Sequence, residues 1–241
     1  MESTAFGRLL GALVAPAKTF RAIAERPTWL LPFLVVCLTP VLPGLLAAPK
    51  IDWEGVVRAQ LERADVDVPR EQMEQAVATW EKLGPVLTYV GPLMIAVSIL
   101  LFTVVFWGAF TLAGGQPGFK RSLAVVSHAM LPLAVAALLS IPVVMSLDTI
   151  GAQQLESGSY LQSSLAAFAP EDAGPVLLAL LSKIDVFTIW TVVLLAIGFR
   201  HAAGVSPRTA ALTAGLLWLV WICVNVGLAA LGRLAAGGGG S

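Results

Sequence analysis

The stretch GPLMIAVSILLFTVVFWGAFTLAGGQPGFKRSLAVVSHAMLPLAVAALLSIPVVMS, residues 91–146, decides the fold class of this chain. It holds two long apolar runs that are separated by a short glycine-rich connection carrying Lys120 and Arg121. A helix that crosses a bilayer needs roughly 20 mostly apolar residues, and each run meets that length. The order of apolar run, basic turn and second apolar run therefore predicts two membrane-crossing helices.

Three further apolar runs extend this pattern over the rest of the chain. Of the 241 residues, 57% are hydrophobic and only 12% are charged, whereas a soluble domain usually carries about 25% charged residues. We predict an all-α fold, a polytopic membrane helical bundle of five transmembrane helices plus interfacial amphipathic helices, forming one domain over residues 1–236. The five spans are expected at about residues 29–48, 86–113, 122–146, 176–199 and 209–231. The tail GGGGS, residues 237–241, is typical of an artificial linker and is left out of this prediction.

Basic residues lie on alternate sides of the five runs. Segments 1–28, 114–121 and 200–208 carry an excess of Lys and Arg. Segment 49–83 holds five basic and eight acidic residues, and segment 147–174 holds four acidic residues and no basic one. Short loops rich in Lys and Arg stay in the cytoplasm. The charge pattern therefore predicts a cytoplasmic N-terminus and a C-terminus outside.

Apolar side chains recur at helical spacing over residues 5–25, and most of the basic side chains lie off that face. A basic amphipathic helix in front of a span predicts an interfacial helix on the cytoplasmic leaflet. Pro16 is expected to split it, because proline suits the first turn of a new helix better than a helix interior. Anchoring of the first span is the simplest role for this segment, and docking of a partner is the alternative. The first span itself is expected to kink or to end early near Thr39.

Two short surface helices are predicted between the first and second spans, over residues 52–64 and 70–82. Asp52 is a suitable N-cap for the first, and Pro69 is suited to start the second. The acidic residues around the turn between them match no calcium-binding loop, and no His or Cys joins them. We therefore predict a solvated acidic face here and no metal site.

Four polar side chains within the apolar runs form a candidate intramembrane polar site: Asp185, Lys183, His128 and Asn225. A charge at the centre of a spanning helix costs roughly 2.5–3.5 kcal/mol on insertion scales. In one interpretation, residues 175–182 form a separate interfacial helix and the span begins near Ile184. In the other, Asp185 faces the bundle interior and bonds to His128, Asn225 or Lys183. A structural role for Asp185 is the simpler expectation, and a transport or proton-handling role is the alternative.

The sequence contains no nucleophile elbow, zinc-protease pair, phosphate loop or pair of catalytic carboxylates. Two histidines exclude a His-rich metal site, and no basic and aromatic stripe indicates nucleic-acid binding. The two cysteines, Cys37 and Cys223, both fall in apolar runs and are expected to be packing residues. We therefore expect a protein that is not an enzyme, with no catalytic residue, cofactor or metal.

Three stretches carry motifs in a fixed order: LLGALVAPAKTFRAIAERPTW at 9–29, GGQPGFKRSLAVVSHAMLP at 114–132, and KIDVFTIWTVVLLAIGFRHAAGVSPRTAAL at 183–212. Together they resemble the bacterial branch of the Yip-domain family, which is named for proteins that interact with Ypt/Rab GTPases. The family pattern maps onto Pro16 and Phe20, onto Gly115, Phe119, Lys120, Leu131 and Pro132, and onto Asp185, Phe187, Trp190, Ile197 and Gly198.

The resemblance implies a five-span integral membrane protein with a cytoplasmic N-terminus, in agreement with the charge pattern. Its bacterial branch implies a location in the bacterial plasma (inner) membrane. Eukaryotic relatives have a longer cytoplasmic N-terminal region that binds trafficking partners, whereas about 28 residues precede the first predicted span here. Binding of a Rab-type GTPase is therefore not expected.

Two functional hypotheses follow from these observations. The first is a non-enzymatic membrane scaffold, or an assembly or trafficking-like factor, which lies in the lipid bilayer and binds other membrane proteins or itself. The second is a small transporter, channel or lipid-handling protein with a polar site around the fourth span. Convergence of the four polar side chains on one cavity would favour the second hypothesis.

Overall fold

The computed structural model describes residues 4–64, 68–157, 160–161, 163–169 and 175–237. The regular elements of these residues are helices, which confirms the predicted all-α fold class. The α-helices are α1 Ala5–Val14, α2 Pro16–Glu25, α3 Leu30–Leu38, α4 Val41–Ala47, α5 Trp53–Ala64, α6 Arg70–Leu112, α7 Phe119–Ala129, α8 Leu131–Ser146, α9 Ala152–Ser157, α10 Pro175–Ser182, α11 Val186–Ala203 and α12 Pro207–Gly237. Two short 3-10 helices, η1 Ala48–Lys50 and η2 Leu165–Phe168, complete the set.

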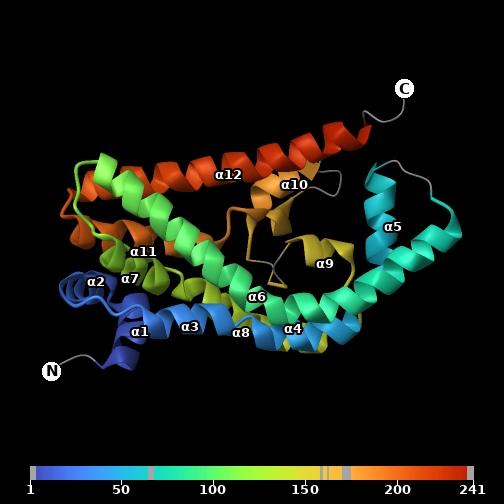
Figure 1. Cartoon of the computed structure of the whole chain (residues 1–241), viewed down its shortest axis with the longest axis horizontal. Coiled ribbons are helices and arrows are strands. Elements are labelled where there is room, and N and C mark those ends of the chain that lie inside the picture. Colours follow the sequence, from blue (N-terminus) through green and yellow to red (C-terminus); the bar gives the residue numbers. More distant parts are fainter. Residues whose placement is uncertain (1–3, 65–67, 158–159, 162, 170–174, 238–241) are drawn as a thin grey trace.

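Five helical segments in the described part of the chain are long and apolar enough to cross a membrane, as the sequence predicts. They are Leu30–Lys50, Arg70–Leu112, Phe119–Ser146, Val186–Ala203 and Pro207–Gly227. These segments extend along the long axis of the molecule, and the two chain termini lie at its opposite ends (Figure 1).

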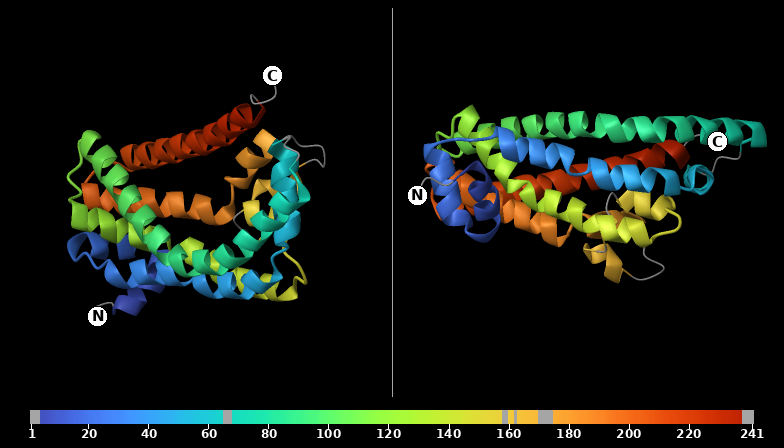
Figure 2. Two further views of the ribbon diagram at one scale, coloured as in Figure 1. Left: turned by 45° about the vertical axis from the view of Figure 1, so that its right-hand side comes forward. Right: turned by 90° about the horizontal axis from the view of Figure 1, so that it is seen from below.

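The short connections collect at two opposite ends of the bundle (Figures 1 and 2). We call the end that holds α1, α2 and the α6–α7 and α11–α12 connections the basic end. The end that holds α5, the start of α6, α9 and α10 is the acidic end. The segments that the charge pattern assigns to one side of the membrane therefore lie together in the folded chain.

Proline interrupts the first and third spans. The first consists of α3 and α4, which meet at Thr39 and Pro40, as the sequence predicts. The carbonyl oxygen of Val35 accepts from both the backbone amide and the hydroxyl of Thr39 at the break, at 3.0 and 2.5 Å. The third consists of α7 and α8, which meet at Met130, two residues before Pro132.

The second surface helix predicted over residues 70–82 is not a separate element. It is the first part of α6, a single helix of 43 residues that continues through Pro85 and Pro92 into the second span. A proline inside a helix removes one hydrogen bond and kinks or breaks many helices, but here packing holds the helix together. The Trp53 indole lies against buried Gly84, in the place that a Cβ atom would occupy, and it stacks on Trp80 with ring centroids 5.9 Å apart. The Asp52 cap of α5 is confirmed, since its carboxylate accepts from the Gly55 amide at 3.0 Å.

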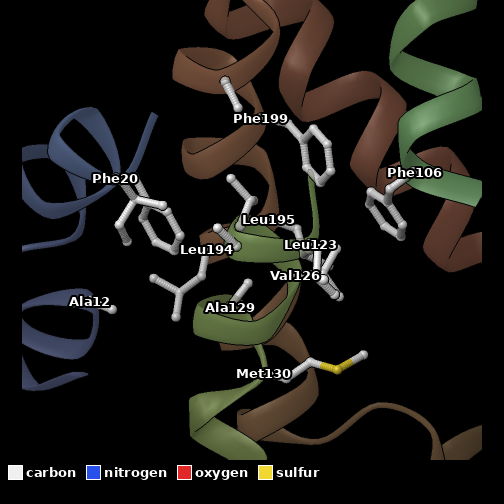
Figure 3. Packing of buried hydrophobic residues seen from close by; sticks show 14 of the residues in the cluster. Ala12, Phe20, Phe106, Leu123, Val126, Ala129, Met130, Leu194, Leu195 and Phe199 are labelled. Carbon is white, nitrogen blue, oxygen red and sulfur yellow. The ribbon is translucent and has the colours of Figure 1, made fainter. Parts of the chain in front are cut away.

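Aromatic rings hold α6 and α11 together in the buried core close to the basic end (Figure 3). Phe110 stacks on Phe199 with centroids 4.4 Å apart and planes 4° apart, and Phe106 lies 5.5 Å from the same ring. Stacked aromatic pairs are worth about 0.5–1.5 kcal/mol beyond the area that they bury. The stack therefore fixes the second span against the fourth.

Lys50 ties the first span to the third at the acidic end. Its ammonium donates to the carbonyl oxygens of Val144, Met145 and Leu147 at 3.0, 3.1 and 2.7 Å. These are the unpaired carbonyls at the C-terminus of α8, where the helix dipole favours a cation. Two backbone bonds between Lys50 or Asp52 and Ile150 lie beside this contact, at 2.8 and 3.0 Å.

Replacement of Lys50 by Met should lower the free energy of unfolding by about 2 kcal/mol, because hydrogen bonds to a charged group are each worth about 1.5–3 kcal/mol and the partly buried carbonyls of Val144 and Leu147 lose their donor. Lys82→Met is the matched control, since Lys82 is exposed on α6. Thermal and denaturant unfolding of both variants in detergent measure the difference. Equal losses in the two variants would contradict the role assigned to Lys50.

Candidate functional site

Asp185 lies at the N-terminus of α11, directly after a break in the predicted fourth span. Its carboxylate accepts from the backbone amides of Phe187 and Thr188 at 2.8 and 3.1 Å, and also from the Thr188 hydroxyl. This is the geometry of a helix N-cap, which satisfies amides that have no partner within the helix. The carboxylate is thus bonded at the start of its own helix, and these bonds do not join it to His128, Asn225 or Lys183.

From the length of α11, we expect Asp185 to lie at the boundary of the membrane. Val186–Ala203 has 18 residues, which at about 1.5 Å per residue extends over about 27 Å. The hydrocarbon core of a bilayer is about 30 Å thick. Residues 175–182 form the separate helix α10, as in the first interpretation of the sequence, and the fourth span begins ten residues later than its predicted start at residue 176.

Backbone groups at this break are paired by the segment that precedes α10. The Leu165 amide donates to the Ile184 carbonyl at 3.0 Å, and the Val186 amide donates to the Ser163 carbonyl at 3.4 Å. Together these bonds form a short antiparallel bridge between Ser164 and Asp185. A polar group that is removed from water without a hydrogen bond is costly, so this pairing stabilises the break.

Lys183 and Asn225 contact the same residue of α12, Trp221, through its ring and its backbone carbonyl respectively. The Lys183 ammonium lies 5.7 Å from the centroid of the Trp221 ring, a cation–π contact. The Asn225 side-chain amide donates to the Trp221 backbone carbonyl at 2.8 Å. Asp185, Lys183 and Asn225 therefore lie at the acidic ends of neighbouring helices, and each makes its own local contact.

His128 lies away from the other three predicted site residues. It is buried in α7, where its Nδ1 atom is 2.8 Å from the Ala124 carbonyl oxygen and its ring meets the Phe20 ring edge-on at 6.5 Å. A cavity of about 230 Å³ between α5 and α6 is lined by Glu54, Arg70, Met73, Glu74, Val77, Ala78 and Glu81, and by none of the four. In the ranges that the structure covers, no three His, Cys, Asp or Glu residues are placed to hold a metal ion.

The family motifs converge at a different place, the contact between Phe20 and Gly198. Phe20 is fully buried, and a Cβ atom on Gly198 would lie 2.9 Å from its ring and 2.5 Å from the Val125 side chain. Phe20 comes from the first motif stretch, Val125 from the second and Gly198 from the third. A hydrogen in place of a side chain on α11 thus allows α2 and α7 to pack against it.

The other motif residues start helices, form contacts between helices or lie on the surface. Pro16 starts α2, and Pro132 lies in the first turn of α8. Gly115 is buried against the end of α11, where a Cβ atom would lie 2.7 Å from that of Ala203, and Gln116 donates its amide to the Ala203 carbonyl at 3.0 Å. Phe119 meets Trp107 edge-on at 6.2 Å. Phe187 and Trp190 are half-buried on α11, and Lys120 is exposed.

Several polar residues that the sequence analysis did not single out also matter at these sites. Thr188 completes the cap of α11, and its place three residues after Asp185 is a recognisable capping spacing. Among the described residues, three buried polar atoms have no hydrogen-bond partner: Thr191 Oγ1, His201 Nε2 and Trp218 Nε1. All three lie on the neighbouring helices α11 and α12. The hydropathy pattern of the sequence does not show which polar atoms on these helices lack a partner, so it could not identify them.

Replacement of Gly198 by Ala should destabilise the protein by about 1–3 kcal/mol, the usual cost of forcing extra atoms into a packed core. Gly215→Ala on α12 is the matched control, because a Cβ atom there meets nothing within 4 Å. The control should be neutral or stabilising by up to about 1 kcal/mol, since alanine favours the helix. Thermal unfolding in detergent compares them, and a Gly198→Ala protein as stable as the control would refute the packing argument.

Asp185→Leu should lower stability by about 0.5–2 kcal/mol, the usual loss when a helix cap is removed. Asp185→Ser should retain most of the stability, because a serine hydroxyl also caps a helix. The exposed residue Asp148 provides the control Asp148→Leu. Unchanged melting of Asp185→Leu together with lost solute flux in liposomes would instead indicate a transport role.

Comparison with known proteins identifies the family of the chain and one relative. The model of the Yip1 domain matches residues 10–236 of the chain. The chain is 26% identical over 219 residues to "Membrane protein YknW" of Bacillus subtilis (strain 168), which covers 90% of this chain and 88% of that protein. No solved structure matches the chain.

The matched range contains every family-pattern residue from Pro16 to Gly198. The five apolar spans and the Bacillus relative support a location in a bacterial membrane. The chain belongs to the Yip1-domain family.

Proposed function

We propose that this protein is a non-enzymatic membrane scaffold or assembly factor that binds other membrane proteins through the exposed faces of α6 and α12. The observation that carries the proposal is the low burial of these two spans. In the most apolar 18-residue windows of α6 and α12, 22% and 17% of the residues are buried, against 39% in each of Phe119–Ser146 and Val186–Ala203.

The exposed face of α12 is a continuous apolar stripe. Its large side chains recur every three or four residues, so they lie on one side of the helix: Leu212, Leu216, Leu219, Val220 and Val224. Cys223 is also exposed within this set. Gly215 has open space where a Cβ atom would lie, and so do Gly91 and Gly108 of α6. Glycines on a spanning helix let another helix approach closely, which supports a helix as the partner.

The polar side chains inside the spans support a binding role over transport, because most of them bond within their own helix. The Thr103 hydroxyl donates to the Ile99 carbonyl at 2.7 Å, and the Ser127 hydroxyl donates to the Leu123 carbonyl at 2.8 Å. His128 and Asn225 likewise contact carbonyls of their own helices. Groups that are already bonded in this way do not offer a solute a row of free partners.

One observation favours the second candidate function, a small transporter or lipid-handling protein. Thr191 Oγ1 and Trp218 Nε1 are buried on α11 and α12, and neither has a bonding partner among the described residues. Buried polar atoms normally have a partner, either protein or water. Water or a polar ligand between these helices would satisfy them.

A photoreactive residue in place of Leu219 should give a discrete protein adduct in native membranes, because Leu219 is 53% exposed on the α12 stripe. The same residue in place of Leu138, which is 54% exposed on α8, provides the control and should give lipid adducts only. Gly215→Leu should reduce the Leu219 adduct about tenfold, since overpacking a helix contact costs about 1–3 kcal/mol.

The identity of the adduct, read by mass spectrometry, distinguishes a second copy from another membrane protein. Lipid adducts alone at Leu219, or a protein adduct of equal yield at Leu138, would contradict the proposal. A Gly215→Leu protein that melts at the wild-type temperature ensures that a lost adduct does not reflect misfolding.

A further inference from the structure

The amphipathic N-terminal segment divides into two helices with different surroundings. The apolar side chains of α2, Phe20 and Ile23, are fully buried against the bundle. Helix α1 buries only Leu9 and Ala12 on its inner side. Its outer side leaves three large side chains exposed, by 66% for Phe6, 54% for Leu10 and 81% for Val14. Because these residues are four apart, they form a single apolar face along the helix.

Helix α1 is fixed in place by specific contacts. Arg8 donates to the Arg26 carbonyl at 2.7 Å and to the Thr28 hydroxyl at 3.1 Å, which joins α1 to the residues just before the first span. Gly11 packs so closely on α2 that a Cβ atom would lie 2.6 Å from the Thr19 hydroxyl. The helix lies crosswise to α3, at the same end of the molecule as the other basic connections (Figures 1 and 2).

The basic end, to which this apolar face belongs, carries a large excess of positive charge. Eight Lys and Arg residues belong to its described segments, against the single carboxylate of Glu25: Arg8, Lys18, Arg21, Arg26, Lys120, Arg121, Arg200 and Arg208. Arg21 of α2 and Arg200 of α11 both lie close enough for their charges to act on His201. The cations of α2 therefore lie beside those at the end of the fourth span.

We propose that α1 is an anionic-lipid docking element, with Phe6, Leu10 and Val14 inserted at the boundary of the acyl chains. The basic residues around it, Lys18 and Arg21 in particular, then contact lipid phosphates. An apolar face flanked by cations is the arrangement of helices that lie in the interface of anionic leaflets. A second copy of the chain is a poor occupant, because the same face would bring two sets of cations together. The inference does not depend on the proposed scaffold function.

The test uses the full-length protein in lipid nanodiscs. Cys223 is replaced by Ser and buried Cys37 is kept, and a bimane fluorophore is attached to Leu10→Cys. Gln116→Cys is the matched control, since Gln116 is exposed in the α6–α7 connection of the same end. Doxyl-labelled lipid should quench the probe at position 10, and aqueous iodide should quench the probe at position 116. Quenching by doxyl lipid should increase when phosphatidylglycerol replaces part of the phosphatidylcholine.

The charge contribution is tested with the double variant Lys18→Gln and Arg21→Gln, which should abolish the increase caused by phosphatidylglycerol. Lys82→Gln at the acidic end should leave it unchanged. Strong iodide quenching at position 10 would overturn the proposal, because the face would then lie in water. Protection from both quenchers would overturn it in favour of a covering protein. Equal doxyl quenching in neutral and anionic nanodiscs would refute the preference for anionic lipid.

Discussion

The contact between the Phe20 ring and Gly198 determines how the rest of the bundle is arranged. It seats α2 in a space that exists only because α11 carries no side chain at that position, and Val125 of α7 closes the same space. Once α2 is seated on α11, it also lies against α7, and the first part of the first span, α3, packs on the same helix α7. The aromatic stack of Phe110 on Phe199 then places α6 on the adjoining part of α11. A protein interior packs as densely as a crystal of small organic molecules. One close contact of this kind therefore limits where the neighbouring helices can lie.

The large features of the fold were predictable because they follow from hydropathy and charge. Five apolar runs, the break near Thr39, the split at Pro16 and the Asp52 cap all appear in the structure. The continuity of α6 was not predictable, because local sequence shows Pro85 but not the Trp53 ring that packs beside it. The start of the fourth span was also misplaced, since α10 is as apolar as a true span and hydropathy does not report a change of direction.

The candidate site was less predictable than the fold. Asp185, Lys183, His128 and Asn225 are all polar residues within apolar runs of the sequence, but only the fold decides which of them are neighbours. His128 belongs to the core near Phe20, whereas Lys183 and Asn225 contact Trp221. Each group finds a partner a few residues away or on the next helix, because a polar atom left unpaired in hydrocarbon is costly. Local pairing of this kind is invisible to a search for long-range constellations.

The short length of α11 also ties the protein to the thickness of its bilayer. The other four apolar segments have 21 residues or more, whereas α11 has 18 between Asp185 and the turn at Gly204. A thicker hydrocarbon layer would draw Asp185 and Lys183 below the headgroups, or would have to thin around the protein at a cost for every ångström. Because the break limits the length of α11, the protein should be most stable in membranes whose hydrocarbon core is no thicker than the length of this helix.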